Sequence, residues 1–260
     1  MQKLTVFTMA FSAILLFSTA FAHAADGPIA ISSIEELQRI GNEEAYPLNG
    51  NYALARDIDA SRTAYWNNGQ GFVPIGQRLD EDDSLSFKGW FDGQGHVIRG
   101  LVINRPEDQG VGLFGSIGST AVVVNVNLEG GTITGSHYVG SLVGENWSQE
   151  VAACSSSADV NGLTRIGGMA GINRGILDSC NTAGTVQGNE YVGGLVGRNY
   201  KGIVQNCYST GEVTGIHWTG GLIGGSCDGE TYESFWDIEL SGLTISAGGV
   251  GMTSDESARL

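Results

Sequence analysis

The chain has 260 residues, of which 41% are hydrophobic, so it is long and apolar enough for one large domain or two small ones. Its formal net charge is −15 and its pI is about 4.5; with no basic stripe, this acidity excludes nucleic acid and anionic lipid surfaces as partners. Glycine is frequent, with 41 residues, but it lacks a period of three, which excludes a collagen-like chain.

Residues 1–24 are predicted to be a secretory signal peptide. Lys3 gives the positive start, an apolar run follows, and the small-residue sequence AHA at 22–24 provides a cleavage site, so the mature chain is expected to begin near Ala25. No other apolar run approaches the roughly 18 residues that span a bilayer, so no transmembrane segment is expected. We therefore expect a soluble exported protein in the periplasm, outside the cell or on the cell surface.

The two ends are predicted to differ from the middle of the chain. Residues 25–105 are expected to form an N-terminal cap and the first strands. The sequence SSIEELQRIG within this region is typical of a short helix, because Ser33 and Glu36 have capping-box spacing and Gly41 provides a stop. Residues 240–260 are predicted to be a C-terminal tail, whose last ten residues carry little apolar surface and are expected to fray.

Residues 106–239 contain a phrase that recurs five times. The copies are VGLFG at 111–115, YVGSLVGEN at 138–146, IGGMAGIN at 166–173, YVGGLVGRN at 191–199 and WTGGLIGGS at 218–226. The final glycines of these phrases are separated by 29, 27, 26 and 27 residues, a range of self-similarity that indicates a stacked solenoid. Segments such as GTVQG and GEVTG alternate polar and apolar residues, as strands with one buried face do.

This repeat predicts an all-β fold, a right-handed parallel β-helix in which about 27 residues form one coil, with a short helix capping its N-terminal end. Stacked coils place like residues over one another at a strand spacing of about 4.8 Å. Two interior columns are therefore expected. One consists of Leu113, Leu142, Met169, Leu195 and Leu222, and the other of Ile133, Val160, Val186 and Val213.

The phrase GGLVG at 193–197 resembles the GLUG repeat of bacterial secreted and surface proteins. The segments YALARDIDAS at 52–61, FVPIG at 72–76 and FKGWFDGQGHVIRGLVI at 87–103 are similar to these proteins too, so the resemblance covers roughly residues 30 to 250. It implies a β-helix in an adhesin-like or structural protein, and it does not imply that the repeat is a catalytic unit.

One predicted column is a candidate binding site. It contains Tyr138, Arg165, Tyr191 and Trp218, so an arginine lies between aromatic residues and is placed to make cation–π contacts. An exposed strip of this kind is a platform for sugar rings, and an extracellular glycan or a surface protein is the expected partner. We favour the alternative, a structural ladder that covers the wall of the coil, and keep this column as the best candidate for a binding site.

Two further columns are predicted to be structural. The first contains Cys154, Cys180 and Cys207, and the second contains Asn146, Asn173 and Asn199. The spacing of the cysteines permits one disulfide, but we favour a column of buried thiols that act as small apolar groups; Cys227 is out of phase with them. Stacked asparagines are expected to hydrogen-bond along their column.

Catalytic alternatives rest on carboxylates. Asp92 and His96 lie in a glycine-rich bend, which we interpret as a structural turn. Glycoside hydrolysis needs two carboxyl groups about 5–9.5 Å apart, and the residues to test for this chemistry are Asp92, Asp159 and Glu212.

Metal binding is not expected. His137 and His217 share a column but lie three coils apart, roughly 14 Å, which is too far for one metal ion. The acidic run DEDD at 80–83 lacks the spacing of a calcium loop and is interpreted as a solvated insertion. No other cofactor is expected either.

Together these patterns predict an exported, non-catalytic β-helix module with a binding, adhesive or structural role at or beyond the cell surface. The alternative is a carbohydrate-active β-helix enzyme, either a polysaccharide lyase or a hydrolase. An enzyme requires converging acidic groups, whereas a binding module requires only an exposed strip. The open edges of the solenoid also permit self-association.

Overall fold

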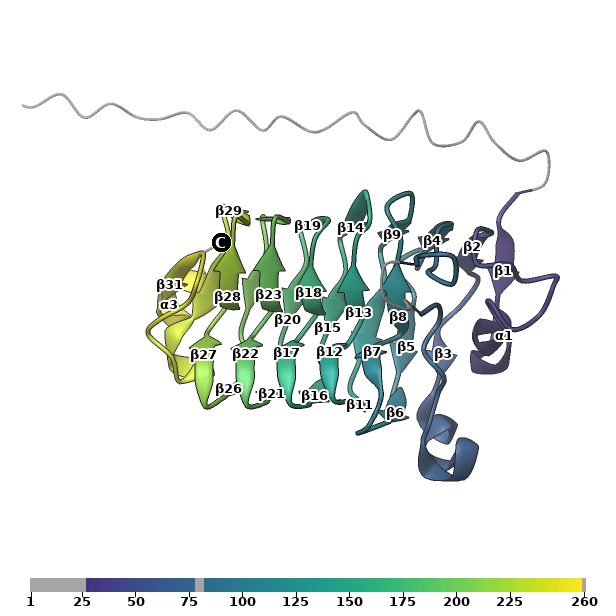
Figure 1. Ribbon diagram of the computed structural model, residues 1–260, viewed down its shortest axis with the longest axis horizontal. Helices are drawn as coiled ribbons and strands as arrows, with labels where there is room; N and C mark the ends of the chain where they lie inside the picture. Colours follow the sequence, from purple (N-terminus) through teal and green to yellow (C-terminus); the bar gives the residue numbers. More distant parts are fainter. Residues whose placement is uncertain (1–26, 78–81, 259–260) are drawn as a thin grey trace, which may run out of the picture.

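The computed structural model describes residues 27–77 and 82–258, and Figure 1 shows them as one elongated stack of short strands. The predicted signal peptide at 1–24 lies outside these residues. The strands form five sheets, within which neighbouring strands pair in parallel. The protein is therefore the parallel β-helix that the sequence predicts.

We call the five sheets walls 1 to 5, in the order in which the chain crosses them. Wall 1 contains β1 (Ile29–Ile31), β2 (Asn51–Leu54), β4 (Trp90–Asp92), β9 (Val122–Val124), β14 (Glu150–Ala152), β19 (Ile176–Asp178), β24 (Ile203–Gln205) and β29 (Glu230–Tyr232). Wall 2 contains β3 (Ile58–Asp59), β5 (Val97–Arg99), β10 (Asn127–Glu129), β15 (Ser155–Ser156), β20 (Asn181–Thr182), β25 (Tyr208–Ser209), β30 (Phe235–Asp237) and β31 (Val250–Met252).

The other three walls are shorter stacks of five strands each. Wall 3 contains β6 (Val102–Asn104), β11 (Thr132–Thr134), β16 (Asp159–Asn161), β21 (Val186–Gln187) and β26 (Val213–Thr214). Wall 4 contains β7 (Gln109–Val111), β12 (His137–Gly140), β17 (Thr164–Gly167), β22 (Glu190–Gly193) and β27 (His217–Gly220). Wall 5 contains β8 (Phe114–Ile117), β13 (Val143–Asn146), β18 (Ala170–Asn173), β23 (Val196–Tyr200) and β28 (Ile223–Cys227).

The chain crosses all five walls five times, and we call each crossing a coil. Coils 1 to 5 comprise residues 90–117, 122–146, 150–173, 176–200 and 203–227. The register between coils follows the sequence repeat, because Ile133 pairs with Val160, Val160 with Val186, and Val186 with Val213. The predicted valine and isoleucine column is confirmed.

The leucine column of the repeat forms the second interior stack, as predicted. Backbone N–H groups of Leu142, Met169 and Leu195 each donate to the carbonyl of the equivalent residue in the next coil, over 3.2, 2.9 and 2.9 Å. All five members of the column are at most 1% exposed. A single coil buries too little apolar surface to be stable alone, so this continuous column is what couples the coils.

A short helix covers the N-terminal end of the stack. The helix α1 (Ile34–Arg39) begins as predicted, because the Ser33 hydroxyl accepts a hydrogen bond from the N–H of Glu36 over 3.2 Å. The reciprocal bond differs slightly from the predicted capping box, since the Glu36 carboxylate accepts from Ser32 rather than from Ser33. Two 3₁₀ turns follow later in this segment, η1 (Ser61–Tyr65) and η2 (Asn67–Gly69).

The C-terminal segment is more structured than predicted. It contains α2 (Ile238–Ser241), then β31, which extends wall 2, and finally α3 (Ser254–Ser257). Thr253 and Glu256 form a full capping box for α3, so the expectation that the last ten residues fray is wrong for this part of the segment. Among the described residues, no helix is long and apolar enough to cross a membrane.

Candidate binding surface

The predicted aromatic and arginine column lies along wall 4. Tyr138, Arg165, Tyr191 and Trp218 occupy equivalent positions in β12, β17, β22 and β27, between residues that pair in register with the next coil. All four have a left-handed backbone, with φ angles of 56°, 62°, 55° and 49°. Non-glycine residues seldom adopt this conformation, so its recurrence marks a bend that every coil makes at this position.

Side chains in this column stack on one another. The guanidinium carbon of Arg165 lies 4.9 Å from the ring centroid of Tyr138 and 5.8 Å from that of Tyr191. The rings of Tyr191 and Trp218 are nearly parallel, with centroids 4.6 Å apart and an angle of 10° between their planes. Because neighbours cover these ring faces, the middle of the column has the geometry of a structural ladder rather than of an open platform. Trp218, at its end, is 58% exposed.

A second column of the same kind runs along the edge of wall 5. The guanidinium carbon of Arg174 lies 4.1 Å from the ring of Trp147 and 5.2 Å from that of Tyr200, and Arg198 contacts both Tyr191 and Tyr200. Sequence reasoning missed this column. Its signal is present in the repeat, because the three stacked members, Trp147, Arg174 and Tyr200, each directly follow one of the ladder asparagines.

Glycine packing explains how walls 4 and 5 come so close. A Cβ atom built on Gly171 would lie 2.4 Å from the carbonyl carbon of Tyr138, and one on Gly197 would lie 2.5 Å from that of Arg165. No side chain fits at these distances, whereas glycine permits close backbone approach. In coils 3, 4 and 5, the last glycine of the repeated phrase therefore packs against the backbone of the aromatic or arginine residue that the preceding coil contributes to the column.

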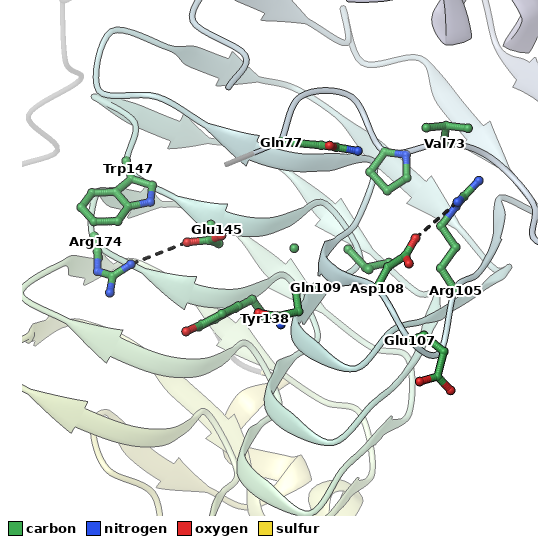
Figure 2. A pocket seen from close by; sticks show the side chains of 13 residues that line it. Val73, Gln77, Arg105, Glu107, Asp108, Gln109, Tyr138, Glu145, Trp147 and Arg174 are labelled. Atoms are coloured by element: carbon green, nitrogen blue, oxygen red, sulfur yellow. Dashed lines mark hydrogen bonds and ion pairs between the residues drawn. The ribbon is translucent and has the colours of Figure 1, made fainter. Parts of the chain in front are cut away.

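The column ends in coil 1, where its position is taken by Gly110. The flanking pairs, Gln109 with His137 and Val111 with Val139, place Gly110 opposite Tyr138. Here Tyr138 lines a groove of about 740 Å³, which is bordered on its other side by the 73–77 segment (Figure 2). Because Arg165 covers the ring face toward coil 3, the face toward coil 1 is the one that borders the groove.

The charged side chains of this groove, which we call the Tyr138 groove, are largely paired. Arg105 lies 3.3 Å from Asp108, and Arg174 lies 3.7 Å from Glu145, as the dashed lines in Figure 2 show. The Nε of Arg105 also donates to the carbonyl of Phe72 over 3.1 Å, which fixes the guanidinium at the rim. The groove is therefore polar but contains compensated charges.

The asparagine column forms a buried hydrogen-bonded ladder. The amide nitrogen of Asn146 donates to Asn173 over 2.7 Å, that of Asn173 donates to Asn199 over 3.0 Å, and that of Asn199 donates to the Gly202 carbonyl over 3.1 Å. All three residues are fully buried. The ladder lies beside the second aromatic column and fixes the corner from which those side chains extend.

The cysteine column consists of free, buried thiols. Cys154, Cys180 and Cys207 are at most 1% exposed, and each thiol donates to the carbonyl two residues earlier, over 3.2, 3.2 and 3.0 Å. Burial raises the pKa of the Cys207 thiol well above its ordinary value, and the hydrogen bond with the Cys154 thiol does the same to the pKa of Cys180. The thiols of Cys180 and Cys207 therefore stay protonated and are poor nucleophiles.

Of the three carboxylates considered for catalysis, Asp92 lies at a different wall from Asp159 and Glu212. Asp92 is buried in wall 1, where it accepts a hydrogen bond from the N–H of Gln94 over 2.8 Å, as expected of a turn residue. Asp159 lies in wall 3 and accepts from the N–H and hydroxyl of Thr185 over 3.0 and 2.6 Å. Glu212 is exposed just before β26 in the same wall. Asp92 is thus separated from the other two by position in the coil.

The histidines are dispersed as well. His137 and His217 occupy one column with Thr164 and Glu190 between them. His96 contacts Asp57 over 3.3 Å. Over the described ranges 27–77 and 82–258, no three histidine, cysteine or acidic side chains come close enough together to hold a metal ion.

The acidic run DEDD is only partly visible, because residues 80 and 81 lie outside the described ranges. Asp83 pairs with Lys88 over 2.9 Å, and Asp82 accepts a hydrogen bond from the N–H of Ser84 over 2.8 Å. The interpretation of the whole run as a solvated insertion stays a prediction.

Known proteins share parts of this architecture. The family description of the GLUG motif matches residues 188–214, which extend from the end of wall 3 in coil 4 to the same wall in coil 5. The chain carries the GLUG motif. The matched stretch has the length of one full turn of the helix. It begins with wall 4 of coil 4 and ends with wall 3 of coil 5.

Two curated relatives align with the chain over much longer stretches. Halomucin of Haloquadratum walsbyi is 36% identical over 174 residues, which is 66% of this chain and 2% of halomucin. A protein of Evansella cellulosilytica, provisionally described as a Gly-rich membrane protein, is 35% identical over 128 residues, which is 47% of this chain and 14% of the relative. The chain thus spans only a small part of the length of these relatives.

A solved structure has the same fold. It is a Bacteroides ovatus protein, provisionally described as an immunoglobulin A1 protease, with a TM-score of 0.67 and 16% identity. The match covers 91% of this chain and 87% of the solved chain. At this identity the likeness concerns the fold alone.

Proposed function

We propose that this chain is an exported surface module that binds a neutral glycan in the Tyr138 groove without cleaving it. The GLUG coils provide a stiff stack, and the groove lies where their repetition ends. One observation carries the proposal: Tyr138 presents a ring face to a groove of about 740 Å³, while Arg165 lies over its other face.

The chemistry of the groove suits a sugar ring. A pyranose has an apolar face of C–H groups that packs on an aromatic ring, while its hydroxyl groups exchange hydrogen bonds with polar side chains at the rim. The amides of Gln77 and Gln109 line the groove and offer both donors and acceptors. Few convergent polar groups around an aromatic surface are typical of small-ligand sites.

Charge selects against acidic glycans. The two guanidinium groups of the groove are engaged with Asp108 and Glu145, so they are not available as a site for a carboxylated or sulfated sugar. The whole chain has a net charge of −15 and repels polyanions. An uncharged, hydroxyl-rich ligand meets neither obstacle.

The location at or beyond the cell surface is supported by two observations outside the groove. The sequence at 1–24 has the pattern of a secretory signal peptide. The Evansella cellulosilytica relative is described as a membrane protein. We infer that the chain, by binding such a glycan, adheres to a glycan-bearing surface.

The test compares two tyrosines of the same column. Binding is screened on an array of neutral and acidic glycans and quantified by calorimetry with the neutral glycan that binds. We expect Tyr138→Ala to weaken binding by about tenfold or more. Tyr191→Ala is the matched control, because Arg165, Arg198 and Trp218 cover its ring; its affinity should stay within about twofold of the wild type.

Three results would overturn the proposal. Absence of binding to every glycan on the array would remove the function, and equal losses in both variants would show that the column matters only for folding. The bound glycan is also incubated with the chain and analysed for shortened products. Their release would favour the carbohydrate-active enzyme.

A further inference from the structure

The Tyr138 groove continues toward the N-terminal segment. Val73 lines this groove and also a second cavity of about 560 Å³, which lies between α1 and Trp66. A smaller cavity of about 280 Å³ shares Arg105 and Asp108 with the Tyr138 groove. The hollows therefore adjoin one another on a surface that extends from α1 to coil 2.

The junction between the two larger hollows is held from both sides. The side-chain amide of Gln38 donates to the carbonyl of Val73 over 3.0 Å and accepts from its N–H over 2.8 Å. On the other side, Arg105 donates to the carbonyl of Phe72. A ligand that crosses Val73 thus meets a backbone already fixed in place, which lowers the entropy cost of binding.

The second cavity repeats the chemistry of the first. Trp66 is half-buried, packs against the core and supplies an aromatic wall. Arg39 lies 3.6 Å from Glu43, and Glu35 lies 2.7 Å from Arg62, so the charges here are paired too. Amide side chains complete the lining. Both cavities therefore combine aromatic side chains, Tyr138 and Trp147 in the first and Trp66 in the second, with amides and compensated charges.

We infer that the two cavities are subsites of one groove, and that this groove binds a neutral polysaccharide chain along the stacking direction of the coils. Tyr138 and Trp66 then contact different sugar units of the same chain. The inference rests on the proposed function and adds chain length as a determinant of affinity. Linked subsites act as one site only when a single ligand reaches both.

Calorimetry with oligosaccharides of graded length tests this inference. The probes are cello-, laminari-, manno- and chito-oligosaccharides from disaccharide to octasaccharide. We expect the affinity of the wild type to rise by about tenfold or more from the shortest to the longest probe of the series that binds. Trp66→Leu keeps apolar packing but removes the ring; this variant should bind short probes like the wild type and lose the rise with length.

A second variant guards against an effect of Trp66→Leu on folding. Asn42 is exposed at the rim of the second cavity, so Asn42→Trp fills that cavity without touching the core. It should lose the length dependence in the same way, with an unchanged thermal unfolding midpoint. Tyr138→Ala should weaken binding of all lengths.

The outcomes separate the two proposals. If no series binds at any length, the proposed glycan function fails and the inference fails with it. If short and long probes bind equally well, or if both second-cavity variants retain the rise with length, the inference is overturned while glycan binding at Tyr138 stands.

Discussion

The five coils and the N-terminal segment stack their strands in the same way, but they differ in whether aromatic and arginine side chains are covered. In the coils, a ring or guanidinium is covered by its counterpart one coil further on, as Tyr191 is by Trp218. Before coil 1 the described chain contributes strands only to walls 1 and 2, and η1, η2 and the 72–77 stretch take the place of the other walls. Next to this segment, Tyr138 of coil 2 borders the Tyr138 groove and Trp66 borders the second cavity. Ring faces are therefore covered where the coils repeat and border cavities where the repeat ends.

The first prediction breaks the repetition inside the core. Leu195→Ala removes one member of the buried leucine column and leaves a cavity between coils that fit closely, so we expect a loss of about 2–5 kcal/mol in the free energy of unfolding. Chemical denaturation followed by circular dichroism measures it. Leu163→Ala, at a position that is 47% exposed, is the control and should cost far less. Similar losses at both positions would contradict the assignment of the column as the coupling element.

The second prediction concerns the ladder at the corner of wall 5. Asn173→Ala leaves the buried amide of Asn146 and the amide oxygen of Asn199 without their partner, so we expect a loss of about 1–3 kcal/mol in unfolding free energy. Asn189→Ala is the control, because Asn189 is an exposed asparagine of coil 4. It should change the free energy of unfolding by less than about 0.5 kcal/mol. A ladder variant as stable as this control would mean that the stacked amides contribute little.

The coils were predictable from the sequence because their geometry is periodic. Once the spacing of the final glycines gave the length of a coil, the column containing Leu142, Met169 and Leu195 followed, and so did the asparagine ladder. The stacking of Tyr191 on Trp218 also follows from register. What periodicity does not give is whether a ring face in such a column is covered or free.

The groove was not predictable, because its geometry does not follow from the period of the repeat. It depends on one missing side chain, at Gly110, and on a segment around Val73 that has no counterpart in the repeat. The bonds that place this segment join Gln38 to Val73 across 35 residues, and no local pattern announces them. The C-terminal segment differs from its prediction for a similar reason, because the polar contacts of Asp237 that help to hold it follow no repeated pattern.

The third prediction contrasts the coils with this C-terminal segment, whose attachment is ionisable. Asp237 accepts hydrogen bonds from the N–H of Leu240 over 2.9 Å and from the hydroxyl of Ser254 over 2.7 Å. Burial by itself raises the pKa of Asp237, but the hydrogen bonds from Leu240, Ser254 and Glu239 together lower this pKa below its ordinary value near 3.8. A carboxylate with a lowered folded pKa stabilises above the unfolded value, and this contribution is lost as pH falls through the folded pKa.

Amide hydrogen exchange resolves this contrast by position, since α2 and α3 report on the segment and wall 5 of coil 4 reports on the repeat. Between neutral pH and about pH 2, protection of α2 and α3 should fall while protection in coil 4 is retained, because the buried contacts of the coil are uncharged. Asp237→Asn should already lower protection of the segment at neutral pH, by about 1 kcal/mol as for a lost helix cap, and its deficit relative to the wild type should shrink in acid. A deficit that stays constant with pH would show that the shape of the side chain, rather than its charge, holds the segment to wall 2.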